Sequence, residues 1–433
     1  MADDASSWLG STPNLSPPDA TAEEIKARTW GAPIADLQAA DPYAFRAGAE
    51  LEIFKRLRRE APVHRQEHHE FGPYWSVTRY DDIMAVDTDH ASFSSEPTIT
   101  IVDQRSDFHM PMFIAMDPPK HDAQRKTVQP IVSGPNLAAL EPLIRERAAA
   151  ILDSLPLGEE IDWVDKVSIE LTAMTLATLF GIPQEDRRKL TYWSDVAVAG
   201  PEAGLYQDPD NWEAERQGIL MGCVGYFLQE WEKRLASGPG GDLISMLAHG
   251  ESTRNMDRME YLGNLILLIV GGNDTTRNTI TGSILALNQN PDQYDLLKSR
   301  PDLIPGMVSE TIRWQTPLAH MRRNATRDVE IGGQSIKQGD KVIMWYVSGN
   351  RDEAKLQDPD RYWVERPDVR RHLSFGFGIH RCVGNRLAEL QLKIIWEEIL
   401  KRFSHVEVTG EPSRTLSSFV RGYTRLPVRL HAH

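Results

Sequence analysis

One cysteine near the end of the chain, Cys382, stands in a setting suited to metal binding. Phe375 opens its segment, Gly376 and Gly378 precede it, Gly384 follows it, and an apolar helical period begins just beyond. A cysteine at the start of a helix meets free backbone N–H groups and the positive end of the helix dipole, which favour the thiolate. Glycines let the backbone approach a flat ligand closely. Taken alone, however, such a cysteine is more often a buried apolar thiol.

A second candidate group lies about a hundred residues earlier, where Gly271 and Gly272 are followed by Asp274 and Thr275. Adjacent glycines and threonines weaken the hydrogen-bond ladder of a helix and can open a local bulge. Such a bulge can hold dioxygen, with Thr275 holding a water or the reacting oxygen and Asp274 passing protons inward from solvent. A glycine-tolerant helix contact lined by threonine explains the pattern equally well.

Two charged residues, Glu310 and Arg313, are three apart and therefore share one face of a predicted helix. On a surface helix such a pair contributes little to stability. It gains a structural role if Arg366 or a neighbour closes a buried network that fixes the loop before Cys382. In isolation, the solvated pair is the better explanation.

Four cationic or titratable side chains are placed to meet an anionic ligand. His121 and Arg125 are four residues apart, hence on one helix face, while Arg323 follows a proline turn and His380 lies two residues before Cys382. Individually, each is more often an ordinary surface residue.

The elements that must position these residues are mainly helical, with a smaller β-rich part. The expected helices are 50–59, most of 137–235, 258–289, 305–315, and the segment from Cys382 to about residue 402. The expected strands are a hairpin through 74–78 and the segments 329–331, 335–336 and 341–346. Residues 1–45 are predicted to be a largely irregular extension, and 46–433 a single domain.

Composition excludes several classes of protein. The 48 basic and 62 acidic residues give a net charge of −14, which disfavours nucleic-acid binding. Two cysteines, Cys223 and Cys382, are too few for a disulfide scaffold or a structural zinc site and suit a reducing cytoplasm. The most apolar run, 262–272, is shorter than the roughly 20 residues that span a bilayer. We therefore expect a soluble cytoplasmic protein.

The motifs together, in this order, resemble the cytochrome P-450 superfamily. The resemblance rests on Phe375-x-x-Gly378-x-x-x-Cys382-x-Gly384, on Glu310-x-x-Arg313 and on Gly271-Gly272-x-Asp274-Thr275-Thr276. It covers nearly the whole chain from about residue 43. It implies a triangular, mostly helical fold with one haem b, a haem-thiolate monooxygenase activity, and Cys382 as the axial iron ligand.

The same resemblance assigns further roles. Arg366 should complete the network of Glu310 and Arg313, and Asp274 and Thr275 should form the catalytic proton relay. The implied haem-binding residues are His121, Arg125, Arg323, His380, Phe375, Gly376, Gly384 and Gly271. Because His380 stands where many relatives have arginine, its contact is expected to be weaker or pH-dependent.

The resemblance is to soluble bacterial members, which implies particular partners. Electrons would come from a [2Fe-2S] ferredoxin that an FAD-containing NAD(P)H reductase reduces, and the chain is expected to be a monomer. A ferredoxin is acidic, so a basic docking patch is expected on the cysteine side. The residues predicted for this patch are Lys120, Arg125, Lys126, Arg381 and Arg386.

Three stretches, 111–117, 270–278 and 316–323, are similar to bacterial alkane ω-hydroxylases. This implies terminal hydroxylation of medium-chain alkanes, alkyl compounds or fatty acids. The apolar residues expected by position to line the substrate site are Met112, Phe113, Leu267, Val270, Leu318, Phe419 and Val420. Apolar walls also suit a terpene, and some of these side chains belong to the core in an alternative interpretation.

Three other functions stay open at this point. A peroxygenase that uses hydrogen peroxide would not need the proton delivery that Asp274 and Thr275 offer. A haem-based sensor or ligand carrier would bind the cofactor without chemistry. A helical binding protein with a free cysteine would bind no haem at all.

Overall fold

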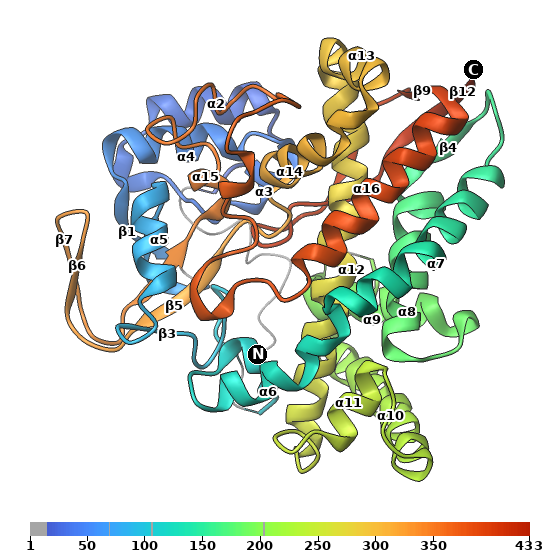
Figure 1. Cartoon of the computed structure of the whole chain (residues 1–433). Helices are drawn as coiled ribbons and strands as arrows, with labels where there is room; N and C mark the ends of the chain where they lie inside the picture. The colour runs from blue at the N-terminus through green and yellow to red at the C-terminus, as the bar shows by residue number, and fades with distance from the viewer. Residues whose placement is uncertain (1–14, 69, 105–106, 202–203) are drawn as a thin grey trace.

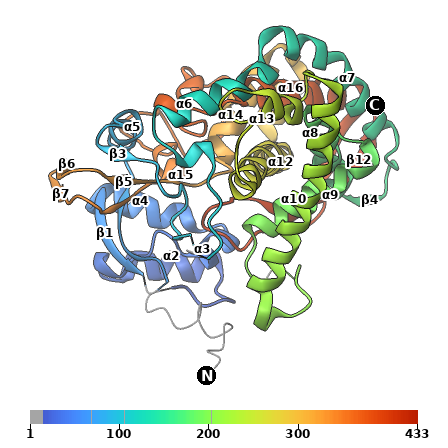
Figure 2. The same cartoon turned by 90° about the horizontal axis from the view of Figure 1, so that it is seen from below.

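A long helix, α12 (Arg258–Gln289), runs through the middle of the molecule, and the other elements are arranged around it (Figures 1 and 2). The computed structural model describes residues 15–68, 70–104, 107–201 and 204–433. The helix has the bounds that the sequence predicts. Asp257 caps its first turn by accepting hydrogen bonds from the N–H groups of Met259 and Glu260, and Pro291 opens the next helix.

The helices make up most of the fold, as expected. Those before α12 are α2 (Ala22–Gly31), α3 (Pro42–Ala47), α4 (Glu50–Glu60), α5 (Tyr80–Thr88), α6 (Lys120–Val128), α7 (Gly134–Asp153), α8 (Glu170–Phe180), α9 (Arg187–Val198), α10 (Trp212–Ser237) and α11 (Leu243–His249). Those after it are α13 (Pro291–Ser299), α14 (Ile304–Gln315), α15 (Tyr346–Gly349) and α16 (Asn385–Arg402). None of the described helices combines the length and apolarity that a bilayer crossing requires.

The β-rich part lies beside the N-terminal helices, on the side of α12 opposite α7 and α8 (Figure 1). One five-stranded sheet has the order β1-β2-β8-β5-β3, from β1 (Val63–His68), β2 (Gly72–Val77), β8 (Lys341–Met344), β5 (Met321–Ala325) and β3 (Phe93–Ser94). Smaller sheets contain β4 (Glu160–Asp162), β6 (Val329–Ile331), β7 (Gln334–Ile336), β9 (Phe403–Val408), β10 (Ser413–Arg414), β11 (Tyr423–Arg425) and β12 (Pro427–Ala432). Strand β5, which carries Arg323, was not predicted.

The N-terminal segment corrects one expectation, because most of its described part is not irregular. Helix α2 begins with a capping box in which Thr21 and Glu24 satisfy each other's backbone N–H groups. Ile25 and Phe45 are buried in a cluster with Trp345, so the segment belongs to the core rather than to an extension. Residues 1–14 lie outside the described part of the chain.

A buried carboxylate ties α16 to α7. Glu398 of α16 accepts hydrogen bonds from Arg145 of α7 at 3.0 Å and from Lys401 and Arg402 at 2.6 Å each. Burial raises the pKa of Glu398, but these hydrogen bonds outweigh it and bring the pKa to about 2. The helix that follows the cysteine loop is therefore held in place by charge as well as by apolar packing.

Candidate active site

The cysteine loop is folded back on itself ahead of α16. The backbone N–H of Cys382 donates to the carbonyl of Phe375 at 2.8 Å, and the N–H groups of Gly384 and Asn385 hydrogen-bond the sulfur. Gly378 has a φ of 67°, and a Cβ there would lie 2.5 Å from the carbonyl oxygen of Asp87. The position therefore requires glycine both for its backbone conformation and for the close approach of α5.

The backbone N–H groups lower the pKa of Cys382, as the sequence predicts, but burial has a larger opposite effect. Burial raises the pKa of the thiol, and this effect exceeds the lowering by the backbone N–H groups and by the guanidinium groups of Arg125 and Arg381. The residue as a whole nevertheless keeps solvent-accessible surface, in contrast to the buried Cys223. A metal ion bound to this sulfur would displace its proton outright.

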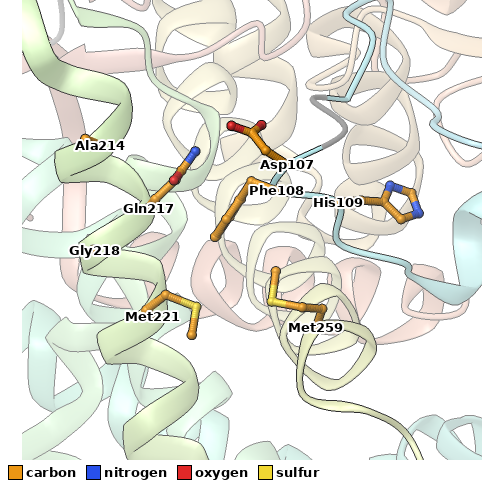
Figure 3. A pocket seen from close by; sticks show the side chains of 8 residues that line it. All are labelled: Asp107, Phe108, His109, Ala214, Gln217, Gly218, Met221 and Met259. Atoms are coloured by element: carbon orange, nitrogen blue, oxygen red, sulfur yellow. The ribbon is translucent and has the colours of Figure 1, made fainter.

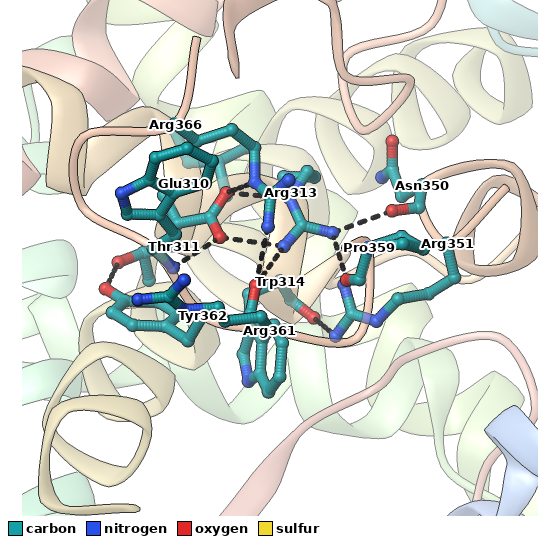
Figure 4. Close-up of polar contacts among 12 residues, drawn as sticks. Glu310, Thr311, Arg313, Trp314, Asn350, Arg351, Pro359, Arg361, Tyr362 and Arg366 are labelled. Atoms are coloured by element: carbon teal, nitrogen blue, oxygen red, sulfur yellow. Dashed lines mark hydrogen bonds and ion pairs between the residues drawn. The ribbon is translucent and has the colours of Figure 1, made fainter. Parts of the chain in front are cut away.

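Glu310 and Arg313 form a buried pair on α14 rather than a solvated one (Figure 4). Both side chains have zero exposure, and Arg313 donates to the carboxylate from Nε at 2.7 Å and from Nη2 at 2.8 Å. Arg366, also buried, donates from Nε at 3.0 Å to the same carboxylate. The carboxylate and the two guanidinium groups thus come together as the sequence predicts.

This network fixes the loop that leads to the cysteine. Arg313 donates to the carbonyls of Asn350 and Pro359 at 2.8 and 2.9 Å, and Arg366 donates to that of Asp358 at 3.0 Å. Glu310 in turn accepts the backbone N–H of Trp363 at 2.9 Å. Charge-assisted bonds of this kind are about twice as strong as neutral ones.

Two of the predicted cofactor-binding histidines lie against each other. The ring centroids of His121 and His380 are 4.2 Å apart. Within the described chain, Nε2 of His121 and Nδ1 of His380 are buried and have no hydrogen-bond partner. Burial, followed by the nearby charges of Arg323, His121 and Arg125, lowers the pKa of His380, so its imidazole is neutral in the protein alone. Arg125 donates to the carbonyl of Arg381 and so joins α6 to the cysteine loop.

Arg323 forms an ion pair with Asp87, a residue that sequence reasoning missed. Asp87, at the end of α5, pairs with Arg323 at 2.9 Å, and both side chains are buried. Its second oxygen accepts the hydroxyl of Tyr346 at 2.9 Å and the backbone N–H of Phe377 at 2.7 Å. Burial raises the pKa of Asp87, and Arg323 opposes this effect. One carboxylate therefore connects a predicted haem-binding arginine to the cysteine loop.

On α12, Gly271 and Thr275 are accessible within a helix that is mostly buried. Gly271 is exposed and Thr275 partly exposed, although their neighbours Asn273 and Asp274 are fully buried. The Thr275 hydroxyl donates to the Gly271 carbonyl at 2.7 Å. The helix is continuous through this stretch, so the structure does not show the bulge that the sequence allowed as one of two explanations.

Asp274 lies in a polar cluster that the sequence did not predict. Ser194 donates to its Oδ1 at 2.9 Å, and Arg277 pairs with the same oxygen at 3.0 Å. Arg277 also pairs with Asp195 of α9 at 2.5 Å, and Asp195 is partly exposed. Burial raises the pKa of Asp274 despite the lowering by Arg277. Its Oδ2 has no partner in the part of the chain that the structure describes.

The predicted substrate residues fall on three segments. Met112 and Phe113 lie in the loop before α6, Leu267 and Val270 lie on α12, and an isolated β-bridge joins Leu318 to Val420, next to Phe419. Phe113 and Val420 are buried in the packed interior, whereas the other five are partly exposed.

A hollow of about 640 Å³ adjoins the loop before α6 and the first turn of α12, and it was not predicted (Figure 3). The loop ahead of Met112 faces α10 and the first turn of α12 across it. Its lining residues are Asp107, Phe108, His109, Ala214, Gln217, Gly218, Met221 and Met259. No local sequence pattern marks them, because they come together only in the folded chain.

The site fits a haem with a thiolate ligand. Cys382 is accessible, and Gly271 has no side chain that would block a flat ligand. Two buried imidazole nitrogens, Nε2 of His121 and Nδ1 of His380, have no hydrogen-bond partner among the described residues. Arg125 lies near the thiol and Arg323 near His380, so cationic groups are available for the two propionate carboxylates that a haem carries.

Comparisons with known proteins agree with this geometry. The family model described as Cytochrome P450 matches residues 219–426. The chain is 38% identical over 391 residues to linalool 8-monooxygenase of Pseudomonas putida, covering 88% of this chain and 95% of that one. It is 33% identical over 412 residues to methyl-branched lipid omega-hydroxylase of Mycobacterium tuberculosis, covering 92% and 95%.

A solved structure is similar throughout its length. Cytochrome P450-153 from Novosphingobium aromaticivorans has a TM-score of 0.85 and 46% sequence identity, with 91% of this chain and 99% of that one covered. The mainly helical architecture with its smaller β part is the same. The chain therefore belongs to the cytochrome P450 family and is a haem b-dependent monooxygenase that is similar to bacterial members of the family.

Proposed function

We propose that this cytochrome P450 hydroxylates the terminal carbon of medium-chain alkanes or other alkyl chains. The observation that supports this most is one face of α12. Leu267, Gly271 and Thr275 follow each other at intervals of four residues, so they share that face, and Val270 lies beside them. All four are less than fully buried, as are Leu268 and Gly272, whereas most residues of α12 are buried. An apolar surface therefore leads directly to the residues assigned to oxygen chemistry.

The hollow beside α10 and α12 is consistent with an access route for an uncharged alkyl substrate. Met259 on its wall and Gly271 are twelve residues apart, about 18 Å along the helix axis. Phe108, Met221 and Met259 offer apolar surface, and methionine side chains adapt to irregular shapes (Figure 3). The described lining contains no lysine or arginine, the side chains that would select a carboxylate. We therefore favour alkanes over fatty acids.

In the proposed mechanism, bound haem supplies reductive activation of dioxygen, which electron donation from a thiolate ligand promotes. Asp274 receives protons at the surface side of its cluster, where Asp195 is partly exposed. Arg277 holds Asp274 there and does not itself relay protons, because a guanidinium is not deprotonated in proteins. The raised pKa of Asp274 favours a neutral carboxyl that can donate. Thr275, adjacent in sequence, orients the final donor.

We further propose that electrons arrive from a [2Fe-2S] ferredoxin and its FAD-containing reductase. Lys120, Lys126, Arg381 and Arg386 are all exposed, and the bond from Arg125 to the Arg381 carbonyl brings α6 beside the cysteine loop. Such a patch would attract an acidic partner despite the net charge of −14. Lys120 also pairs with Glu260 at 2.9 Å, so part of its charge is compensated.

Substrate titration tests the proposal. Octane should convert the haem to high spin and give 1-octanol with ferredoxin, reductase and NAD(P)H, while octanoate should bind more weakly. A terpene substrate is the second candidate, because the chain is 38% identical to linalool 8-monooxygenase. If linalool shifts the spin state and octane does not, the terpene assignment replaces the alkane one.

A further inference from the structure

A chain of buried polar side chains joins the start of α12 to the loop before α6. Asn264 of α12 accepts the backbone N–H of Phe113 at 2.9 Å and donates from Nδ2 to Gln124 of α6 at 3.2 Å. Gln124 donates in turn to Glu260, which pairs with Lys120. Asn264 and Gln124 are almost completely buried. We call Asn264, Gln124 and Glu260 the loop clasp.

The loop also touches the helix through its backbone. A Cβ at Gly263 would lie 2.1 Å from the carbonyl oxygen of Pro111, so the loop rests directly on α12 at this point. The neighbouring Asn264 then holds Phe113 two residues further on. Backbone contact and amide hydrogen bond thus fix one short stretch of loop from two adjacent helix positions.

The loop clasp holds the segment between the hollow and α6, the helix that carries His121. Asp107, Phe108 and His109 line the hollow immediately before the fixed stretch. His121, which faces His380, lies on α6 after it. Movement of residues 110–116 would therefore change the shape of the proposed access route and the placement of Met112 together.

We propose that Asn264 is a positioning residue that sets the regioselectivity of hydroxylation by holding residues 110–116 on α12. This rests on the proposed function, since it takes Met112 and Phe113 as neighbours of the substrate. An apolar slot provides little orientation of its own, so a chain end is selected only while the walls stay fixed. Without Asn264, the backbone N–H of Phe113 would be buried without a partner, which costs free energy. The loop would relieve that cost by moving away from α12 toward water.

The test compares three haem-loaded, full-length variants with the parent enzyme. Asn264→Leu removes the acceptor while keeping the same number of side-chain heavy atoms, and Gly263→Ala displaces Pro111 without touching the amide. Asn288→Leu is the matched control on the same helix. Asn288 accepts the backbone N–H of Val408 at 3.0 Å and donates to Val406 at 2.9 Å, but it lies 24 residues from Asn264. That is about 36 Å along the axis.

Hydrogen–deuterium exchange of peptides covering 107–118 gives a readout that needs no substrate. Both Asn264→Leu and Gly263→Ala should accelerate exchange in this segment by roughly tenfold or more, while Asn288→Leu leaves it unchanged. The carbon monoxide difference spectrum should keep its thiolate form in all three. Unchanged exchange in Asn264→Leu overturns the clasp.

Product analysis then tests regioselectivity. With octane, the share of terminal alcohol should fall by about half or more in both Asn264→Leu and Gly263→Ala, and the Kd for octane should rise about fivefold, with kcat changed less. Faster exchange with an unchanged product ratio overturns the positioning role. If the parent enzyme makes no terminal alcohol, the proposed function fails, whereas the product ratio of its actual substrate, together with the exchange data, still decides the role of Asn264.

Discussion

Replacing Asp87 by alanine is expected to loosen the cysteine loop from a distance. Asp87 and Arg323 form a buried ion pair at 2.9 Å, with side-chain exposures of 1% and 4%. Removing one partner of a buried pair typically costs about 3–5 kcal/mol, because the other charge stays buried without compensation. The hydroxyl of Tyr346 and the N–H of Phe377 also lose their acceptor, each worth about 1–3 kcal/mol if water does not replace it.

These costs overlap, since a water molecule entering the space of the lost carboxylate can satisfy some of the donors. We therefore expect Asp87→Ala to lower the free energy of unfolding by about 3–5 kcal/mol, a large share of the 5–15 kcal/mol typical of a folded domain. Asp87→Asn, which keeps an acceptor but removes the charge, should lose about half as much.

Urea denaturation measures the loss of stability in Asp87→Ala and in Asp87→Asn, with far-ultraviolet circular dichroism reporting on the fold and haem absorbance on the cysteine loop. In Asp87→Ala the haem signal should change at lower urea than the dichroism, because the loss is centred on the cysteine loop. Asp328→Ala is the control: Asp328 pairs with Lys337 at 2.8 Å, but both side chains are more than 60% exposed. Its effect should stay within about 0.5 kcal/mol.

A double-mutant cycle with Arg323→Ala identifies the cause. Once the guanidinium is gone, Asp87 has no buried charge to compensate, so the double variant should be less destabilised than the sum of the single variants. A loss below about 1 kcal/mol in Asp87→Ala, or strict additivity in the cycle, would show that the carboxylate does not hold Arg323 and the loop together.

Three further predictions concern other parts of the molecule. Thr275→Ala should keep substrate binding but divert NAD(P)H consumption to hydrogen peroxide; coupling equal to the parent enzyme would count against its role in proton delivery. Glu398→Gln should lower stability by about 1–3 kcal/mol at pH 7. Because the folded pKa of Glu398 lies below its ordinary value, this difference should shrink as the pH falls from about 5 toward 2, and a pH-independent difference contradicts the assignment. Arg386→Glu should slow reduction by ferredoxin more steeply at low salt, whereas Arg429→Glu, remote from the cysteine loop, serves as control; equal rates refute the docking surface.

Local sequence signals were enough for the central helix but not for what packs against it. The bounds of α12 follow from the capping residue Asp257 and from Pro291, both of which act within a few residues. The pair of Asp87 and Arg323 spans 236 positions, so no spacing rule can reveal it. Sequence reasoning also overlooked one local signal, the Thr21-x-x-Glu24 capping box, and therefore assigned residues 22–31 to an irregular extension.

The bulge that the sequence allowed is absent for a physical reason that applies to the site as a whole. Two glycines reduce the stability of an isolated helix, but α12 is held from outside by tertiary contacts along its length. Gly272 packs against Leu176 of α8, and a Cβ there would lie 2.6 Å from that side chain. The helix therefore stays regular while Gly271 remains uncovered, and access to the oxygen-binding region requires no break in the backbone.

Polar ties from α12 occur at intervals along its whole length, which explains why one helix can coordinate the site. Asn264 holds the loop before α6, Asn278 accepts the N–H of Tyr423 at 3.0 Å, and Asn288 accepts that of Val408. Between the first two lie Asp274 and Thr275, the residues assigned to proton delivery. A regular helix keeps its residues at fixed distances from one another. The loop bound near one end and the strands bound near the other are therefore held at fixed positions relative to Asp274 and Thr275. Regioselectivity should therefore depend on Asn264, which holds the loop assigned to the substrate site, whereas the ties to Tyr423 and Val408 contribute mainly to stability.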